Sequence, residues 1–240
     1  MKRFLMIAVV LFLSQSLAFA ESLILAAGAG YKRPLTAIIQ AYEMAGGGKI
    51  DQIYGNVGNI VMEVKASGKV AFMVADANFL NSSGLQFASF HELGSGVLVI
   101  AYRKNVKIQQ PDDLLKPEIT KVAIPDKKFA IYGKAGNEYL RNAGLLDKMR
   151  KKLLVVATVP QVSSYLISGN VDAGFINLTD ALYIKDKLGG YVTVDRASYN
   201  PIKIVVGVVK GYQNNPETKK FLHFLKSAPE VKGILKKAGL

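Results

Sequence analysis

Side chains that could carry out covalent or metal chemistry are scarce in this sequence of 240 residues. His91 and His223 are its two histidines, and it contains no cysteine. The chain therefore lacks a thiol nucleophile and a His/Cys cluster of the kind that holds zinc. It also lacks the G-x-S-x-G turn that exposes the serine nucleophile of many hydrolases, although a Ser-His-Asp set built on His91 is an alternative. We expect no enzyme activity, no metal ligands and no cofactor.

The chemistry that remains belongs to backbone N–H groups at turns made of small residues. Three such turns each open a helix: Ala29-Gly30-Tyr31, Val57-Gly58-Asn59 and, after a longer loop, Tyr132-Gly133. The first N–H groups of a helix have no acceptor within it and lie at the positive end of its dipole. Several helix starts around one point therefore form an anion site. A single turn glycine only permits a positive φ angle, but its recurrence in both halves favours the anion hypothesis.

Acidic and glycine-rich segments offer two further interpretations, a carboxylate pair and a nucleotide site. Asp112 and Asp113 follow Pro111, where helix caps belong, so capping explains them better than acid–base chemistry. Gly28 and Gly30 lack the third glycine of a dinucleotide fingerprint, and no acidic residue ends a strand about twenty residues later. The sequence therefore disfavours a nucleotide site.

The turns must be held by strands that alternate with helices along the chain. Such alternation predicts an α/β fold with mainly parallel sheets, and the second half repeats the pattern of the first. We expect strands at 22–26, 70–74, 96–102, 121–124, 153–158, 173–176 and 202–209, and helices at 34–43, 162–168, 216–226 and 229–237. The amphipathic tail formed by the last two helices should pack on the first half.

The net charge of the chain is +13, and +11 remains after Lys2 and Arg3 of the N-terminal segment are subtracted. A basic protein attracts anionic ligands by electrostatic steering. A basic surface that serves only solubility or a membrane partner is the alternative. Lysines are scattered along the chain without a basic stripe or a nucleic-acid motif, so we expect no nucleic-acid partner.

The N-terminus has the pattern of a secretory signal peptide. Lys2 and Arg3 precede the apolar run 4–13, and the small-residue motif Ala18-Phe19-Ala20 follows. We expect cleavage after Ala20 and a mature chain that begins at Glu21. No lipid-anchoring cysteine follows, so the sequence predicts a free periplasmic protein.

Several motifs in the same order give the mature chain a resemblance to the molybdate-binding proteins of ABC importers. They cover nearly all of it, with small gaps: Leu25-Ala26-Ala27-Gly28-Ala29-Gly30-Tyr31, residues 54–60, Val74-Ala75-Asp76, Ile124-Pro125-Asp126, Gly174-Phe175-Ile176-Asn177 and residues 234–240. The resemblance implies the two-lobed type II periplasmic binding protein fold, with two mainly parallel sheets, flanking helices and a hinge of two chain crossings.

The resemblance also implies an organisation and partners. Residues 1–20 would be the signal peptide, 21–92 and 203–240 the first lobe, and 93–202 the second. The chain would be a monomeric substrate-binding component that delivers an oxyanion, molybdate or tungstate, to a membrane permease. Sulfate, phosphate or a small phosphorylated or carboxylated metabolite is the alternative ligand, reached by Arg33, Tyr31 or Tyr132. A secreted enzyme or an adhesin on the same fold is the alternative of another class.

Transferred residue by residue, the family's ligand contacts fall on Gly30, Val57 with its neighbour Gly58, Ala75, Val162 and Asn177. Tyr31 and Tyr132 of the small-residue turns complete the predicted ligand-binding residues. Gly30 and Val57 stand where the family commonly has serine hydroxyls, and Asn177 stands where it has a tyrosine hydroxyl. Backbone N–H groups and the Asn177 amide are the donors that remain at these places.

Overall fold

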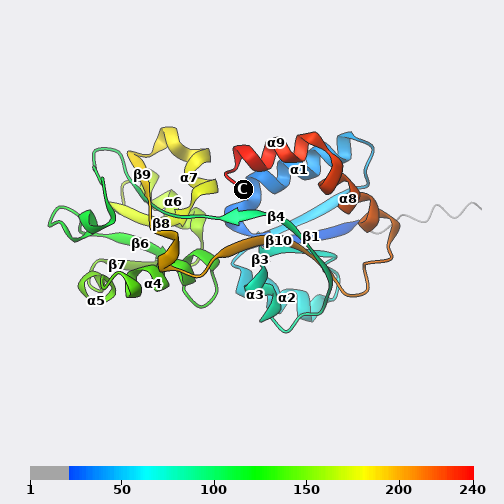
Figure 1. The fold of residues 1–240 in the computed structure, drawn as a ribbon, viewed down its shortest axis with the longest axis horizontal. Helices are drawn as coiled ribbons and strands as arrows, with labels where there is room; N and C mark the ends of the chain where they lie inside the picture. The colour runs from blue at the N-terminus through cyan, green and yellow to red at the C-terminus, as the bar shows by residue number, and fades with distance from the viewer. Residues whose placement is uncertain (1–21) are drawn as a thin grey trace, which may run out of the picture.

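The computed structural model describes residues 22–240, and the predicted signal peptide with its cleavage site after Ala20 lies outside them. In the described part, two five-stranded sheets form two lobes that lie side by side along the long axis of the molecule (Figure 1). No helix among the described residues is long and apolar enough to cross a bilayer.

The first lobe is formed by the two ends of the described chain. Its elements are β1 (Leu23–Gly28), η1 (Ala29–Tyr31), α1 (Lys32–Met44), β2 (Ile50–Gly55), α2 (Val57–Ser67), β3 (Phe72–Asp76), α3 (Ala77–Asn81), β4 (Phe87–Gly96), β10 (Ile202–Val209), α8 (Pro216–Ser227) and α9 (Pro229–Lys237). The strand order is β2-β1-β3-β10-β4, in which β10 runs antiparallel to both of its neighbours. In Figure 1, α1 and α9 lie on one side of this sheet, and α2 and α3 on the other.

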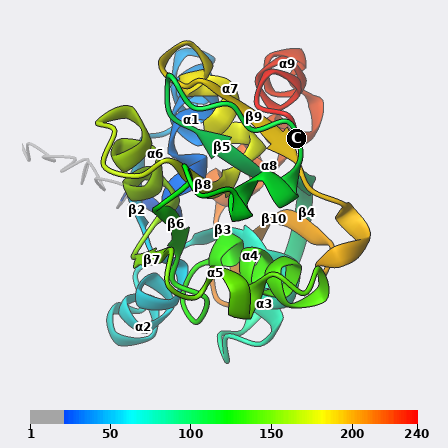
Figure 2. The same ribbon diagram turned by 90° about the vertical axis from the view of Figure 1, so that its left-hand side faces the viewer.

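The second lobe is formed by the middle of the chain and repeats this plan. Its elements are β5 (Leu98–Tyr102), η2 (Pro111–Leu115), β6 (Val122–Pro125), α4 (Ile131–Asn142), α5 (Leu146–Met149), β7 (Leu153–Val156), α6 (Val159–Ile167), β8 (Ala173–Asn177), α7 (Leu178–Ile184), η3 (Lys185–Lys187), β9 (Gly190–Thr193) and η4 (Arg196–Ser198). The strand order is β7-β6-β8-β5-β9, with β5 antiparallel to both neighbours. Figure 2 shows α7 on the same side as α1 and α9, and α4 and α5 on the side of α2 and α3.

The predicted fold class is confirmed, and the two sheets share one strand arrangement. β1, β2 and β3 are mutually parallel in the first sheet, as β6, β7 and β8 are in the second. Each sheet is mixed because one strand, β10 or β5, runs against the others. Parallel strands place their carboxyl ends at one edge of the sheet, where the following helices begin. In this molecule those edges carry the small-residue turns.

The chain crosses between the sheets twice. β4 passes into β5 over Val97, and residues 194–201 lead from β9 back to β10. The strand predicted at 96–102 corresponds to β5 but was begun two residues too early, because Gly96 ends β4 and Val97 separates two strands that belong to different sheets. β4 escaped prediction because its residues alternate between exposed and partly buried, which is typical of an edge strand with polar side chains. β4 also spans the predicted lobe boundary at residues 92 and 93.

The C-terminal helices pack on the first lobe, as the amphipathic pattern predicted. Phe221 of α8 lies 5.1 Å, between ring centroids, from both Tyr42 of α1 and Phe72 of β3. All three side chains are buried. Burial of aromatic rings of this size contributes strongly to the core, so α8 is part of the lobe rather than a free appendage.

Candidate functional site

A cavity of about 30 Å³ lies between the two lobes. Four short segments line it: residues 28–31 and 55–57 of the first lobe, and residues 130–132 and 157–159 of the second. Each segment contains the start of a helix, namely η1 running directly into α1, then α2, α4 and α6. Four helix N-termini from distant parts of the sequence therefore meet around one small space.

Local sequence explains where two of these helices begin. The Asn56 side chain accepts a hydrogen bond from the Gly58 N–H at 3.1 Å and caps α2. Thr158 caps α6 by accepting from the Gln161 N–H at 3.4 Å, and Pro160 occupies the first turn, where its missing N–H has no cost. Each cap fixes the first turn of its helix at the wall of the cavity.

The other two helix starts have no side-chain cap. Neither Gly28, before η1, nor Ala130, before α4, contributes a capping side chain. The first N–H groups of an uncapped helix still need acceptors, which water or a ligand supplies. An anion in the cavity would meet this need in both lobes at once.

The side chains around the cavity carry no charge. Tyr31 and Tyr132, one from each lobe, are buried there, and their hydroxyl oxygens lie 2.5 Å apart. Burial raises the pKa of Tyr31 and Tyr132 well above the usual range, so both hydroxyls stay protonated and neutral. Any positive potential in this space therefore comes from the backbone dipoles of the helix starts rather than from cationic side chains.

Hydrogen bonds across the cleft hold the lobes together beside the cavity. The Gly58 N–H donates to the Phe129 carbonyl oxygen at 3.1 Å, and the Asn56 side-chain amide donates to the Ala157 carbonyl oxygen at 3.0 Å. Both bonds join a residue of α2 or its cap to the second lobe. The structure therefore has a closed cleft.

An ion pair joins the lobes on another side of the cavity. Arg33 of α1 is paired with Asp180 of α7, whose carboxylate also accepts a hydrogen bond from the Ser163 hydroxyl. The Arg33 guanidinium also lies 5.6 Å from the ring centroid of Tyr183. Asp180 is buried while Arg33 is half exposed, so the pair forms at the rim of the interface between the lobes.

Four of the predicted ligand-binding residues line the cavity: Gly30, Tyr31, Val57 and Tyr132. Gly58, although adjacent, has its N–H engaged by the Phe129 carbonyl oxygen and by Asn56. The three turns read from the sequence are thus brought together, and each contributes at least one residue to the cavity.

The other three predicted residues lie away from the cavity wall. Ala75 lies within β3, paired with Val205 of β10, and is fully buried in the sheet. Val162 is buried in α6 against Gly174. Asn177 is buried behind Gly30, to whose carbonyl oxygen its side-chain amide donates at 3.2 Å.

Apart from Tyr132, the second-lobe wall of the cavity was not predicted from the sequence. Ile131, Thr158 and Val159 line it, but the sixth helix was expected to begin at Val162 instead of Val159. The motif Thr158-Val159-Pro160 was the available signal, because a threonine cap followed by proline in the first turn marks a helix start. No comparable signal precedes Ile131, since Ala130 does not cap.

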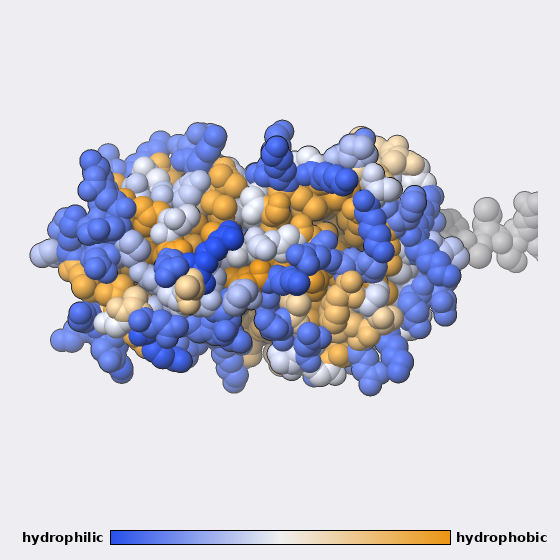
Figure 3. Space-filling view, in the orientation of Figure 1, coloured by the Kyte–Doolittle hydropathy of each residue, from blue (hydrophilic) through white to orange (hydrophobic). Residues whose placement is uncertain are grey.

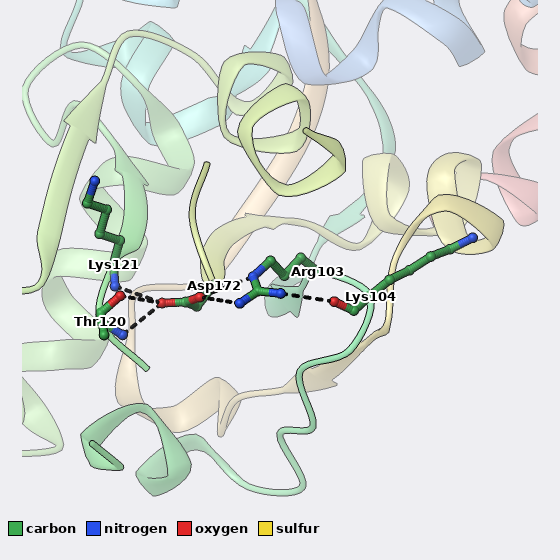
Figure 4. A network of polar contacts seen from close by, with 5 residues as sticks. All are labelled: Arg103, Lys104, Thr120, Lys121 and Asp172. Carbon is green, nitrogen blue, oxygen red and sulfur yellow. Dashed lines mark hydrogen bonds and ion pairs between the residues drawn. The ribbon is translucent and has the colours of Figure 1, made fainter. Parts of the chain in front are cut away.

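Away from the cavity, buried polar side chains connect segments of the fold. Asp172 accepts hydrogen bonds from the Thr120 and Lys121 N–H groups, the Thr120 hydroxyl and the Arg103 guanidinium, and so ties β8 to the segments before β6 and after β5 (Figure 4). His91 contacts Ser89 at 3.0 Å. Among residues 22–240 no group of three or more histidine or acidic side chains could hold a metal ion.

The chain is similar in sequence to known bacterial binding proteins. Residues 23–240 match the family described as bacterial extracellular solute-binding protein. A putative binding protein of Haemophilus influenzae is 27% identical over 219 residues, which cover 89% of this chain and 88% of that protein. The molybdate-binding protein ModA of Azotobacter vinelandii is 24% identical over 222 residues, which cover 89% of this chain and 87% of that protein.

A solved structure shares the fold over most of the chain. The periplasmic molybdate-binding protein of A. vinelandii matches with a TM-score of 0.79 and 22% identity, covering 91% of this chain and 98% of that one. At this identity the likeness concerns the fold. Together with the sequence relatives, it confirms the resemblance that the motifs predicted.

Proposed function

Because this chain belongs to the family of bacterial extracellular solute-binding proteins, we propose that it binds a small tetrahedral oxyanion in the cavity between its lobes. Molybdate and tungstate are the leading ligands. In this function the chain is the substrate-binding component of an ABC importer and delivers the oxyanion to a membrane permease. It acts as a carrier and carries out no chemistry on its ligand.

The observation that carries the proposal is the meeting of four helix N-termini around one cavity with neutral side chains. A tetrahedral oxyanion presents acceptors in four directions, which suits N–H donors that arrive from several helices. Dipoles fixed by the fold need no reorganisation when the ion enters. Donors from both lobes reach the same ion, so binding favours the closed form.

The size of the cavity limits the ligand. Its volume is about 30 Å³, compared with the roughly 10–15 Å³ needed to hold one water. This volume favours a compact inorganic ion over a phosphorylated or carboxylated metabolite. Sulfate and phosphate remain the alternatives of similar shape, and the molybdate-binding relatives favour the larger metal oxyanions.

The same function implies export, two lobes and a hinge between them. Export by a signal peptide at 1–20 would place the mature chain, a monomer, in the periplasm. The lobes would comprise residues 21–92 and 203–240, and 93–202, and would move about the two crossings. Because the transporter would recognise the closed form, ligand binding and delivery are linked through this hinge.

A thermal-shift panel of molybdate, tungstate, sulfate, phosphate and small organic acids tests the proposal. A ligand at one hundred times its dissociation constant adds about 2.7 kcal/mol to stability, which corresponds to a rise in Tm of about 5–10 °C for a chain of this length. We expect this rise with molybdate and tungstate. If neither shifts Tm, the assignment is wrong.

A pair of variants separates binding in the cavity from binding elsewhere. Ala29 lines the cavity, whereas Ala66 is exposed on α2 away from it. Ala29→Phe should fill the space and abolish the thermal shift, and Ala66→Phe should leave the shift unchanged. Equal shifts in both variants would move the site away from the four helix starts.

A further inference from the structure

Asn177 is a polar residue that lies in the interior of the protein. It is fully buried at the end of β8, in the second lobe. Its side-chain amide crosses to the first lobe and donates to the Gly30 carbonyl oxygen at 3.2 Å. Its carbonyl oxygen, Oδ1, has no hydrogen-bond partner among the described residues. A buried acceptor without a partner destabilises the fold, so packing alone gives no reason for an asparagine here.

The Gly30 carbonyl needs a donor because of the local sequence. In a continuous helix the carbonyl of residue 30 would accept from the N–H of residue 34, but residue 34 is Pro34, which has no N–H. The turn that begins α1 thus lacks one of its own hydrogen bonds. Asn177 supplies a donor from the opposite lobe.

Gly30 leaves the space that Asn177 occupies. A Cβ atom at Gly30 would lie 3.1 Å from Asn177 Oδ1 and 3.3 Å from Asn177 Nδ2, which is tighter than an ordinary contact. Gly30 lines the cavity, whereas Asn177 does not. The asparagine therefore reaches the site through the residues of this turn, Gly30 and Tyr31, whose side chain it also contacts.

We propose that Asn177 is a positioning residue that, from the second lobe, holds the Gly30 turn of the first lobe in its anion-binding arrangement when the cleft closes. This inference rests on the proposed function. The hydrogen bond exists only while the lobes are together, because its donor and acceptor belong to different lobes. Closure of the cleft thereby completes the set of fixed N–H donors at the N-terminus of α1.

The test replaces Asn177 by a residue of similar size without hydrogen-bonding groups. Asn177→Leu should raise the Kd for molybdate at least tenfold, measured by titration calorimetry, with most of the change in the dissociation rate. The Tm of the ligand-free variant should change little, because the substitution removes the unpartnered Oδ1 acceptor together with the donor to the Gly30 carbonyl. A role in packing alone predicts the opposite pattern, with a lower Tm and an unchanged Kd, and that result would overturn the proposal. Asn177→Ala repeats the measurement if the leucine variant does not fold.

Thr218 provides the matched control. Its hydroxyl is the other buried side-chain atom without a partner in the described chain, and it lies in α8, away from the cleft. Thr218→Val should leave the Kd for molybdate unchanged. A comparable loss of affinity in this variant would show that the effect of Asn177 is not specific to its position.

A second measurement needs no ligand and so separates this inference from the proposed function. Hydrogen exchange of a peptide covering residues 28–35 should be faster in Asn177→Leu than in the wild-type protein, because the turn loses its external donor. Unchanged exchange there contradicts the positioning role, even if the wild type binds molybdate. If the wild type binds none of the oxyanions, the proposed function fails, and the exchange result still decides the role of Asn177.

Discussion

At Gly30, the lack of a side chain serves two neighbours. It leaves room for the Asn177 amide, and it lets the backbone form part of the cavity wall. The family's serine at this position would supply a hydroxyl donor, but its Cβ would meet Asn177 in the present arrangement. Gly30 and Asn177 are therefore coupled across the cleft, and a change at one should alter the effect of a change at the other.

The coupling predicts non-additive effects on affinity. Gly30→Ala should weaken molybdate binding because the new methyl group displaces the Asn177 side chain. The same substitution made in Asn177→Ala should cost less, since the atoms that the methyl group meets are gone. Calorimetric Kd values for the wild type, both single variants and the double variant measure the coupling energy. Strictly additive changes would contradict this account.

Single residues were the least predictable level of the site. Gly30, Tyr31, Val57 and Tyr132 were found because small-residue turns mark helix starts. Asn177 was expected to contact the ligand, but its amide lies behind Gly30. No local pattern reveals such a relation, because it depends on two lobes meeting across the cleft.

At the scale of elements, helix starts form the site and strands hold them in register. The hydrogen bonds of Asp172 help to hold the strands in register, because they tie β8 to the segments that flank β5 and β6. Burial by itself would raise the pKa of Asp172, but the N–H groups of Lys121 and Thr120, the Thr120 hydroxyl and the Arg103 guanidinium together hold it below the usual value. The ionised form is therefore stabilised in the folded state.

This network predicts a pH-dependent contribution to stability. An aspartate whose folded-state pKa is lowered stabilises the fold above its unfolded pKa of about 3.9, and this contribution is lost as pH falls through the folded value. Asp172→Asn should lower the free energy of unfolding by about 2 kcal/mol at pH 7. The difference from wild type should shrink below about pH 4, as followed by urea unfolding at several pH values.

Asp147 gives the control for that series. Its carboxylate pairs with Arg150 at 2.7 Å, and both side chains are exposed. Asp147→Asn should change the free energy of unfolding by less than about 0.5 kcal/mol. A difference for Asp172→Asn that stays constant from pH 7 to pH 3 would rule out the ionised network as its source.

The elements that begin at clear signals were predictable, and those without them were not. The strand at 202–209 and the helix at 229–237 follow from an apolar run and an amphipathic pattern that begins at proline. β4 and β9 escaped because their side chains are only partly buried, so neither shows a continuous apolar run. The start of α6 was predicted three residues too late, because Thr158 was not recognised as the cap of this helix.

At the scale of the whole molecule, closure and charge would act together on the proposed anionic ligand. The chain without its first twenty residues carries a net charge of +11, and Figure 3 shows hydrophilic residues spread over both lobes on the face in view. This charge steers anions toward the protein over a distance. The cavity itself has no charged side chain, so steering and selection belong to different parts of the molecule.

Closure predicts an effect of a residue outside the cavity. Arg33 pairs with the buried Asp180 across the lobes, so Arg33→Met should destabilise the closed form and raise the Kd for molybdate severalfold. Lys49→Met is the control, because Lys49 pairs with Asp51 within the first lobe, where both side chains are exposed. Titration calorimetry of the three proteins measures the effect. Equal Kd values for Arg33→Met and wild type would contradict a role in closure.

The α/β class was predictable because strands alternate with helices along the chain, and parallel strands bring helix starts to one edge of a sheet. The two-lobed arrangement followed from the resemblance to a known family rather than from this pattern. The enclosure of the cavity was not predictable in the same way. It depends on contacts between lobes, such as the Gly58 N–H with the Phe129 carbonyl oxygen, that join segments far apart in the chain.

The position of a bound oxyanion would test the proposed site directly. Crystals grown with tungstate would show the tungsten atom by its anomalous scattering. We expect one strong peak per chain, enclosed by the N-termini of α1, α2, α4 and α6, with its oxygens within hydrogen-bonding distance of backbone N–H groups. A cavity without a peak, or a peak held by lysine and arginine side chains elsewhere, would contradict this account.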